Sequence, residues 1–212
     1  MRVFTAAAPP FMKNAFVVAG DAADAAAILI DPGDEVEQLL GLVARERLDV
    51  RAILLTHAHL DHITGVGRAK QALGVESWLH QDDLPLYQAV VQQGLMFGLH
   101  VEAQPPVDHF YVPDRPLAFG GLRVEVHHTP GHSPGGVCLA VREHEDVPEL
   151  FVGDTLFAGS IGRTDLPGGN HGVLLASIRS VLFAFDDRTR VHSGHGPPTT
   201  IGAERRSNPF LT

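Results

Sequence analysis

A cluster of side chains that can bind a metal ion or transfer a proton lies in the first third of the chain. Within six residues stand His57, His59, Asp61 and His62, directly after the apolar run 52–55. In an extended segment, the spacing of His57 and His59 points both imidazoles to the same side. Burying so many ionisable groups costs free energy unless a cation compensates them. We therefore predict a metal site here, in preference to a hydrogen-bonded network with a structural role alone.

Three more candidate ligands come later in the chain, each directly after a glycine: His132, Asp154 and His195. Glycine lets the backbone approach closely and adopt unusual dihedral angles, as crowding around an ion requires. Each of the three could by itself be a hydrogen-bonded structural residue, but together with the first cluster they predict one metal centre. Imidazole and carboxylate ligands without a thiolate suit Zn²⁺, Fe or Mn, and this ligand set does not choose among them.

The candidate ligands can meet at one metal centre only if the strands that precede them end close together. Apolar runs bounded by turn residues predict strands at 16–18, 27–30, 52–55, 77–79, 122–126, 137–141, 150–152 and 190–192. Apolar periodicity predicts helices at 64–73, 84–93 and 173–183, and a further helix that begins with Asp34 as its N-cap. Because strands and helices mix along the whole chain, we predict an α/β layered fold in one domain, 1–212.

The charge of the chain argues against nucleic-acid and membrane partners. The 212 residues carry a formal net charge of -9, and the basic pair Arg205-Arg206 is interpreted as solvated surface. No apolar run approaches the roughly 20 residues that a membrane span requires. The N-terminal stretch is interrupted by Pro9, Pro10 and Lys13, which does not fit a signal peptide. We expect a soluble, cytoplasmic protein.

Cys138 is the one cysteine of the sequence. A single cysteine excludes an internal disulfide and a zinc site of the cysteine type. Its place in the apolar run 137–141 predicts a small buried core residue, and a reducing compartment fits this cysteine usage.

The remaining histidines and an acidic run have simpler interpretations. We expect surface or hydrogen-bonded core positions for His80, His100, His109, His144 and His192. His171 follows two glycines and Asn170, and a place near the site and a place on the surface are equally supported. The acidic run 143–146 is interpreted as a solvated turn rather than a cation site.

The run from Thr56 to His62 resembles the signature of the metallo-β-lactamase superfamily, and His132, Asp154 and His195 follow in the order that this family shows. Within the superfamily, the chain resembles the glyoxalase II group, the hydroxyacylglutathione hydrolases. The segments that carry this resemblance are 153–157, 162–169 and 194–197, and the stretch 204–210 is similar to the end of the short form of the group. The resemblance implies a four-layer αββα sandwich with the site at the edge between two β-sheets.

The resemblance also implies two divalent metal ions, with Zn expected first and Fe or Mn as alternatives. One ion would be held by His57, His59 and His132 and the other by Asp61, His62 and His195, with Asp154 bridging both. The implied reaction is hydrolysis of a small-molecule thioester by attack of metal-bound hydroxide. Asp61 and Asp154 are the expected catalytic carboxylates. We expect Arg163 and Asp165 to order the loop beside the metals by pairing within it or with a neighbour, with His171 as a third candidate for a place near the substrate.

The ease with which the leaving group departs favours a thioester over a lactam as the substrate. A thiol with a pKa of about 8.5 can depart as a thiolate without a general acid, whereas an amine needs a proton. S-lactoylglutathione, or a related 2-hydroxyacyl glutathione, is therefore the first substrate to test. The alternatives are a lactone or lactam hydrolase and a persulfide dioxygenase of the same fold, with a single iron at His57, His132 and Asp154.

The long form of the group continues into a helical domain that holds the glutathione tail. We expect no room for that domain here, and so weaker recognition of glutathione. The segment 84–104 and the pair Arg205-Arg206 are the parts expected to remain in reach of the tail.

Overall fold

Alternating apolar side chains along the first strands build a sheet that is buried on both faces. In the computed structural model, which describes residues 1–22, 25–144 and 146–212, this sheet has six strands. Their order follows the chain: β1 (Arg2–Ala8), β2 (Lys13–Ala19), β3 (Ala26–Ile30), β4 (Asp49–Leu54), β5 (Glu76–Leu79) and β6 (His109–Phe110). Neighbouring strands are antiparallel from β1 to β3 and parallel from β3 to β6.

The C-terminal half forms a second six-stranded sheet. Its strands, in spatial order, are β14 (Thr199–Thr200), β13 (Arg190–Ser193), β10 (Glu149–Gly153), β9 (Val137–Glu143), β8 (Leu122–His128) and β7 (Leu117–Phe119). Strands β10 and β13 are parallel and the other neighbours are antiparallel. A small hairpin of β11 (Leu156–Phe157) and β12 (Ser160–Ile161) follows β10. All strands predicted from apolar runs are confirmed.

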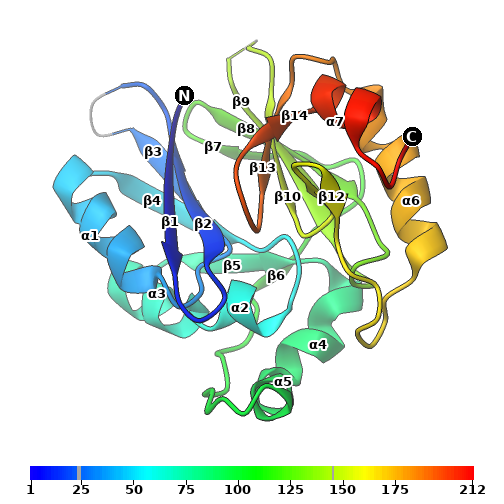
Figure 1. Ribbon diagram of the computed structural model, residues 1–212. Coiled ribbons are helices and arrows are strands. Elements are labelled where there is room, and N and C mark those ends of the chain that lie inside the picture. Colours follow the sequence, from blue (N-terminus) through cyan, green and yellow to red (C-terminus); the bar gives the residue numbers. More distant parts are fainter. Residues whose placement is uncertain (23–24, 145) are drawn as a thin grey trace.

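Helices cover the outer faces of the two sheets (Figure 1). On the N-terminal side they are α1 (Val36–Glu46), α2 (Leu60–Ile63), α3 (Val66–Leu73), η1 (Gln81–Asp83), α4 (Leu84–Gln88) and α5 (Val90–Met96). On the C-terminal side they are α6 (His171–Ser180), η2 (Leu182–Ala184) and α7 (Ile201–Ser207). Among the described residues, no helix combines the length and the apolar character needed to cross a membrane.

Three apolar layers hold sheets and helices together. Even-numbered side chains of β2, β3 and β4, such as Phe16, Ile28 and Leu54, pack between the two sheets. Their odd-numbered neighbours, such as Val17 and Leu29, pack against the helices outside the first sheet. The outer face of the second sheet packs against α6 and α7. The four-layer αββα sandwich implied by the sequence resemblance is thus confirmed.

The prediction that Asp34 caps the first helix is wrong. Helix α1 begins at Val36 with Glu35 at the N-cap position, and no side chain caps it. Asp34 is exposed and accepts a hydrogen bond from Thr64 Oγ1 at 3.0 Å. The reason is tertiary: Glu35 turns into the core to pair with Lys13, and Asp34 reaches across to the next helical segment.

Other helices are confirmed with changed boundaries. The predicted helix 64–73 begins at Val66, and the predicted helix 84–93 divides at Ala89 into α4 and α5. The predicted helix 173–183 begins at His171, where Asn170 caps it, and ends at Ser180 before η2. Cys138 is fully buried in β9, as predicted.

Glu143 corrects the interpretation of 143–146 as a solvated turn. Its carboxylate is buried, accepts a hydrogen bond from the backbone nitrogen of Asp21 at 3.1 Å and lies 3.0 Å from the N-terminal amine of Met1. The prediction failed because these partners stand at the opposite end of the sequence. His144 and Asp146 are exposed, as predicted, and Glu145 lies outside the described residues.

A buried ion pair joins strand β2 to the start of α1. Lys13 and Glu35 are each 1% exposed, and Lys13 Nζ lies 2.8 Å from Glu35 Oε1. Lys13 Nζ also donates to the backbone oxygen of Asp31, and Glu35 accepts from the backbone nitrogen of Gly33 at 2.7 Å. The pair thereby fixes the turn 31–35, which lies under the ligand cluster.

Removing one partner of this pair should be costly. In Lys13→Met the Glu35 carboxylate stays buried without its cation, so we expect the free energy of unfolding of the metal-free protein to fall by about 3–5 kcal/mol. Urea unfolding followed by circular dichroism measures the change. The matched control is Lys13→Met/Glu35→Gln, which removes both charges and should recover much of the loss. Equal stability of Lys13→Met and the parent protein would contradict this role.

Candidate metal centre

Loops after strands of both sheets bring the predicted ligands together at one edge of the sandwich. His57 and His59 follow β4, and Asp61 and His62 lie in α2. The remaining ligands follow β8, β10 and β13, and they are His132, Asp154 and His195. The strands thus place side chains from distant parts of the chain in one cluster, as the sequence predicted.

The first half of the cluster consists of three imidazoles. Donor atoms of His57, His59 and His132 all lie within 4.8 Å of one another, the spacing expected of ligands to a single ion. His59 Nδ1 lies 2.8 Å from His132 Nε2, and the ring of His57 is 4.9 Å from that of His59 and 4.8 Å from that of His132, centroid to centroid.

The second half mixes a carboxylate with imidazoles. Donor atoms of Asp61, His62 and His195 also lie within 4.8 Å of one another. Asp61 Oδ2 is 3.2 Å from His195 Nε2 and 3.7 Å from His62 Nε2.

Asp154 lies between the two halves. Its Oδ1 atom is 3.4 Å from His62 Nε2, and its Oδ2 atom is 3.6 Å from His132 Nε2 and 3.5 Å from His195 Nε2. Its Oδ2 atom thus faces one histidine of each half, and its Oδ1 atom faces a second histidine of the second half, so this carboxylate can contact an ion in either half.

The residues fit divalent cations. Several buried side-chain atoms of the candidate ligand residues have no hydrogen-bond partner within the described residues, and these are His57 Nε2, His59 Nε2, His62 Nε2 and Asp154 Oδ1. Such buried polar atoms cost free energy unless something satisfies them. Imidazole nitrogens and carboxylate oxygens that face one another are the donor set of Zn²⁺, Fe and Mn sites.

Glycines make room for this crowding, as expected from their places before the ligands. A Cβ atom on Gly194 would lie 2.2 Å from Asp154 Oδ1 and 2.8 Å from His62 Cε1. Gly153 has a φ of 51°, in the left-handed region, and a Cβ there would lie 2.3 Å from Thr56 Oγ1. Larger residues at these positions would push the ligands apart.

The first half favours neutral imidazoles. Burial, reinforced by the neighbouring rings of His62 and His132, holds the pKa of His57 well below its usual value. Burial and His132 lower the pKa of His59 to about 3. Only a neutral imidazole can donate its lone pair, so these histidines are ready to bind a cation at neutral pH.

The second half favours positive charge. Burial lowers the pKa of His62, but the carboxylates around it, Asp61 and Asp154 first, outweigh burial and raise the pKa to about 10. For His195 burial again lowers the pKa, and hydrogen bonds to Asp154 and Asp61 raise it to about 9. The carboxylates therefore stabilise a cation at this position, whether it is a proton or a metal ion.

Asp31 is a functional residue that the sequence interpretation missed. It directly follows β3, and its buried carboxylate lies 2.9 Å from His62 Nδ1. It also accepts from the backbone nitrogen of Thr56 at 2.7 Å and from Thr56 Oγ1 at 2.5 Å, and Thr56 Oγ1 is 3.1 Å from His57 Nδ1. A carboxylate on the outer nitrogen fixes the tautomer of a ligand histidine. The available signal was a carboxylate placed between a buried strand and a Pro-Gly turn.

Asp83 was missed as well. Its buried carboxylate accepts from the backbone nitrogen of Ala58 at 2.9 Å, from Ser133 Oγ at 2.8 Å and from the backbone nitrogen of Gly135 at 2.6 Å. It therefore joins the loop that carries His57 and His59 to the loop that carries His132. Local sequence patterns could not indicate this role, because the partners of Asp83 belong to loops that are distant in the sequence.

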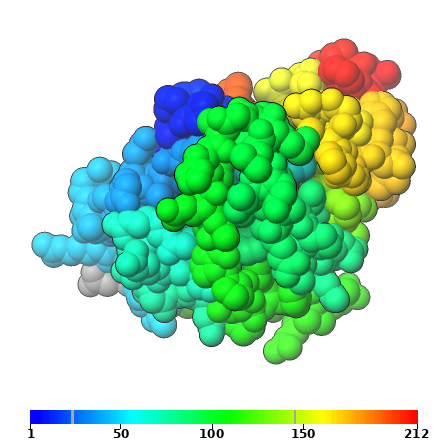
Figure 2. Space-filling view, turned by 90° about the horizontal axis from the view of Figure 1, so that it is seen from below, coloured from blue at the N-terminus to red at the C-terminus, as the bar shows by residue number. Residues whose placement is uncertain are grey.

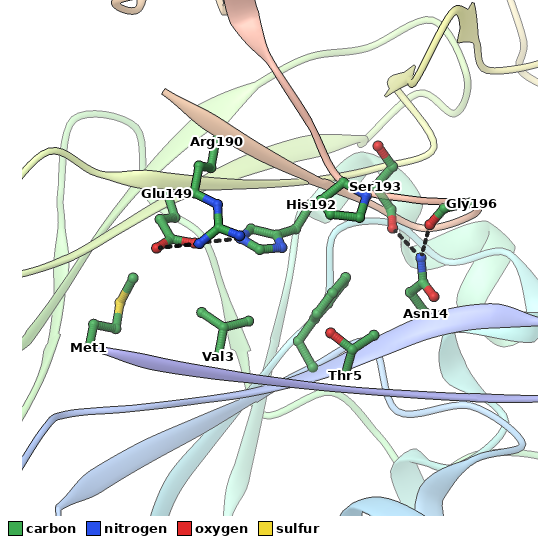
Figure 3. A pocket seen from close by; sticks show the side chains of 11 residues that line it. Met1, Val3, Thr5, Asn14, Glu149, Arg190, His192, Ser193 and Gly196 are labelled. Atoms are coloured by element: carbon green, nitrogen blue, oxygen red, sulfur yellow. Dashed lines mark hydrogen bonds and ion pairs between the residues drawn. The ribbon is translucent and has the colours of Figure 1, made fainter. Parts of the chain in front are cut away.

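The loop of His195 is held from the first sheet. Figure 3 shows Asn14 of β2 pointing at this loop, where its Nδ2 atom donates to the backbone oxygens of Ser193 at 3.0 Å and Gly196 at 2.8 Å. The backbone nitrogen of Asn14 also donates to the backbone oxygen of Gly194 at 2.6 Å. Beside these contacts lies a cavity of about 360 Å³ whose walls include Val3, Glu149 and His192. It contains none of the predicted metal ligands.

Arg163 and Asp165 pair within their own loop, as predicted. Arg163 Nε and Nη2 donate to the two carboxylate oxygens of Asp165, both at 2.7 Å. The backbone oxygen of Arg163 accepts from His132 Nδ1 at 2.8 Å, so the loop also orients a ligand. His171, the third candidate, is exposed at the start of α6 and does not line the pocket above the ligands.

The histidines expected outside the site are outside it. His100 and His144 are exposed, His109 stacks on Trp78, and His192 is buried and lies 2.5 Å from Glu149. His80 stacks on His128, with 4.2 Å between ring centroids, and its Nδ1 accepts from the backbone nitrogen of Asp82.

The two halves should respond separately to substitution. We expect His57→Ala to lose the metal ion of the first half and His195→Ala to weaken binding mainly in the second. Asp154→Ala should reduce binding in both, because its carboxylate lies between them. Metal content per chain, measured by plasma mass spectrometry after dialysis, tests this. Unchanged occupancy of two ions in Asp154→Ala would contradict the bridging position.

Metal binding in the second half should release protons. A bound imidazole must be neutral, whereas His62 and His195 have a pKa of about 10 and about 9 in the metal-free protein. Near neutral pH both are protonated, so this half should release about two protons per chain, and its affinity should fall as pH falls below 9. Calorimetric titration with Zn²⁺ in buffers of different ionisation enthalpy measures the release. His195→Ala is the comparison variant, and an unchanged release there would contradict the assignment.

Comparison with known proteins agrees with this geometry. A family model described as the metallo-beta-lactamase superfamily matches residues 8–195. The hydroxyacylglutathione hydrolase GloC of Haemophilus influenzae is 40% identical over 203 residues, which cover 95% of this chain and 93% of that protein. The BLEG-1 B3 metallo-beta-lactamase superposes with a TM-score of 0.91 at 39% identity, with full coverage of both chains.

A second solved structure, TTHA1623 in a di-iron-bound form, superposes with a TM-score of 0.85 at 42% identity and covers 99% of this chain and 100% of that chain. The family model covers most of the chain and includes the whole span from the first ligand to the last. The ligand cluster, the αββα layers and these matches together show that this chain belongs to the metallo-β-lactamase superfamily.

Proposed function

We propose that the protein is a metal-dependent hydrolase that cleaves thioesters, with two metal ions in the centre and S-lactoylglutathione as the first substrate to test. The observation that carries the proposal is the position of Asp154 between two complete ligand groups, at the floor of an open pocket. The relative named hydroxyacylglutathione hydrolase, at 40% identity over nearly the whole chain, supports the same substrate class.

The charges of the chain prepare the site for attack on a carbonyl. When bound, divalent cations would lower the pKa of a water molecule and polarise the substrate carbonyl. Asp61 and Asp154 offset only part of the charge of two such cations. A net positive charge therefore remains at the pocket floor, where it stabilises the oxygen that becomes anionic during attack.

The pocket supports a leaving group that needs no proton. Apart from the proposed ligands, the described residues that line it are apolar except for Gln93 and Arg163. Neither an amide nor a guanidinium is a general acid at neutral pH. A thiolate, with a parent pKa of about 8.5, can depart without such an acid, whereas the amine of a lactam cannot.

Iron chemistry is the second candidate, because a similar structure is described in a di-iron-bound form. A mononuclear-iron dioxygenase would use His57, His132 and Asp154. The complete second group of Asp61, His62 and His195 favours the two-metal hydrolase, since it offers a second set of donor atoms that a single iron would not use. We propose zinc for the hydrolase, with iron as the metal to compare.

The decisive comparison uses one preparation with measured metal content. We expect loss of S-lactoylglutathione, followed by the absorbance of the thioester, and no oxygen uptake with glutathione persulfide. Removing the metal with a chelator should abolish turnover, and Zn²⁺ should restore it, because the proposed chemistry requires the ions. Rapid oxygen uptake without thioester cleavage would overturn the hydrolase in favour of the dioxygenase.

A further inference from the structure

The walls of the pocket above the ligands are largely apolar. The cavity measures about 220 Å³, and besides the proposed ligands it is lined by Phe11, Leu60, Gln93, Phe97, Arg163 and Leu166. Phe11 lies in the turn between β1 and β2, and Phe97 follows α5. Their rings meet edge to face with centroids 5.7 Å apart. The two rings form one wall of the pocket, which we call the Phe11–Phe97 wall.

This wall is open to solvent at the mouth of the pocket. The side chain of Phe97 is 44% exposed although it is aromatic. In Figure 2 the green segment that contains α5 lies on the face seen from below, between dark blue N-terminal residues and yellow residues that follow β12. These are the three segments that supply Phe11, Phe97 and Leu166 to the pocket. Covering this exposed aromatic surface with an apolar group of the substrate would remove it from water and so favour binding.

The polar groups of the same pocket are already satisfied. Gln93 Nε2 donates to the backbone oxygens of Ala58 and Leu86, and its Oε1 accepts from the backbone nitrogen of Leu60. The guanidinium of Arg163 is held by both oxygens of Asp165. Among the described lining residues no other Lys or Arg is present.

The basic pair expected to reach a glutathione tail is also occupied. Arg205 Nη1 and Arg206 Nη1 both pair with Asp187, and Arg205 Nη2 donates to the backbone oxygen of Phe183. Neither arginine lines the pocket. A leaving group with several carboxylates, such as glutathione, therefore finds no uncommitted side-chain cation here, and the chain as a whole carries a net charge of -9.

We infer that the Phe11–Phe97 wall is a specificity site that binds an uncharged, apolar thiol portion of the substrate. This inference rests on the proposed thioester hydrolysis and names its preferred substrate class: thioesters whose leaving thiol carries an aromatic or aliphatic group. The metal ligands act on the carbonyl, and the wall binds the sulfur substituent that does not react. Binding energy from this remote contact increases kcat/KM.

The test uses three thioesters with the same lactoyl group and different thiols. The thiols are benzyl mercaptan, which is apolar, N-acetylcysteamine, which is small and uncharged, and glutathione, which is charged. We expect the highest kcat/KM with the benzyl thioester. Phe97→Ala should lower that value about tenfold and change the value for N-acetylcysteamine by less than about twofold. Leu95→Ala is the matched control, because Leu95 is 69% exposed near the end of α5, two residues before Phe97, and does not line the pocket.

Adding a positive charge to the wall should change kcat/KM for the apolar and the charged thioester in opposite directions. Phe97→Lys should lower kcat/KM for the benzyl thioester and raise it for S-lactoylglutathione, since it adds a cation to the wall. Because Phe97 is partly exposed, both variants should fold, and circular dichroism checks this. The inference is overturned if the parent protein prefers S-lactoylglutathione, or if Phe97→Ala lowers all three values equally.

Binding measurements separate this inference from the proposed function. Thioether analogues of the three thioesters, which cannot be hydrolysed, are titrated into the metal-loaded protein by calorimetry. If none of the thioesters is cleaved, the hydrolase proposal fails. The inference is still supported when the benzyl thioether binds most tightly and loses that advantage in Phe97→Ala, and it is overturned when the glutathione thioether binds most tightly.

Discussion

Compensation of buried charge at the seam between the two sheets is the constraint on which the rest of the structure depends. Imidazoles and carboxylates that would each be costly to bury alone are placed within a few ångströms of one another. Neutral rings occupy one half, and the carboxylates of Asp61 and Asp154 attract positive charge to the other. The cluster can be buried only because its members, and the cations they suit, satisfy one another.

That constraint explains why the supporting residues are themselves buried and charged. Asp31 reaches a ligand histidine from behind, and Asp83 joins the backbones of two ligand loops. The pair of Lys13 and Glu35 fixes the turn that presents Asp31. The carboxylates of Asp31, Glu35 and Asp83 each accept a hydrogen bond from a backbone nitrogen of a loop, where no regular strand or helix satisfies that group. These contacts hold the loops that carry the candidate ligands.

The mouth of the site is built differently. Its wall comes from a turn and from the end of a short helix, and exposed aromatic rings take the place of buried polar contacts. In our proposals, the reaction and the choice of substrate are therefore assigned to separate parts of the molecule. Because one fold can carry sites for different reactions, membership of the superfamily does not by itself name the substrate.

The sequence by itself determined the strands, the layered architecture and the group of candidate ligands. The apolar runs of β2, β3 and β4 are strong local signals, and the candidate ligands stand in turns or loops that follow such runs, three of them directly after a glycine. The bidentate pairing of Arg163 with Asp165 was also predictable, because the two residues are neighbours in the chain.

Only the tertiary structure decided the roles of Asp31, Asp83 and Glu143, and it also decided that Asp34 caps nothing. Asp83 and Glu143 have partners 25 to 142 residues away, a separation at which local patterns carry no information. The meeting of Phe11 with Phe97 has the same origin: a turn and a helix end become neighbours only when the first sheet forms. Periodicity reports which face of an element is buried, whereas a polar partner or a pocket wall depends on which distant loops the packed sheets bring together.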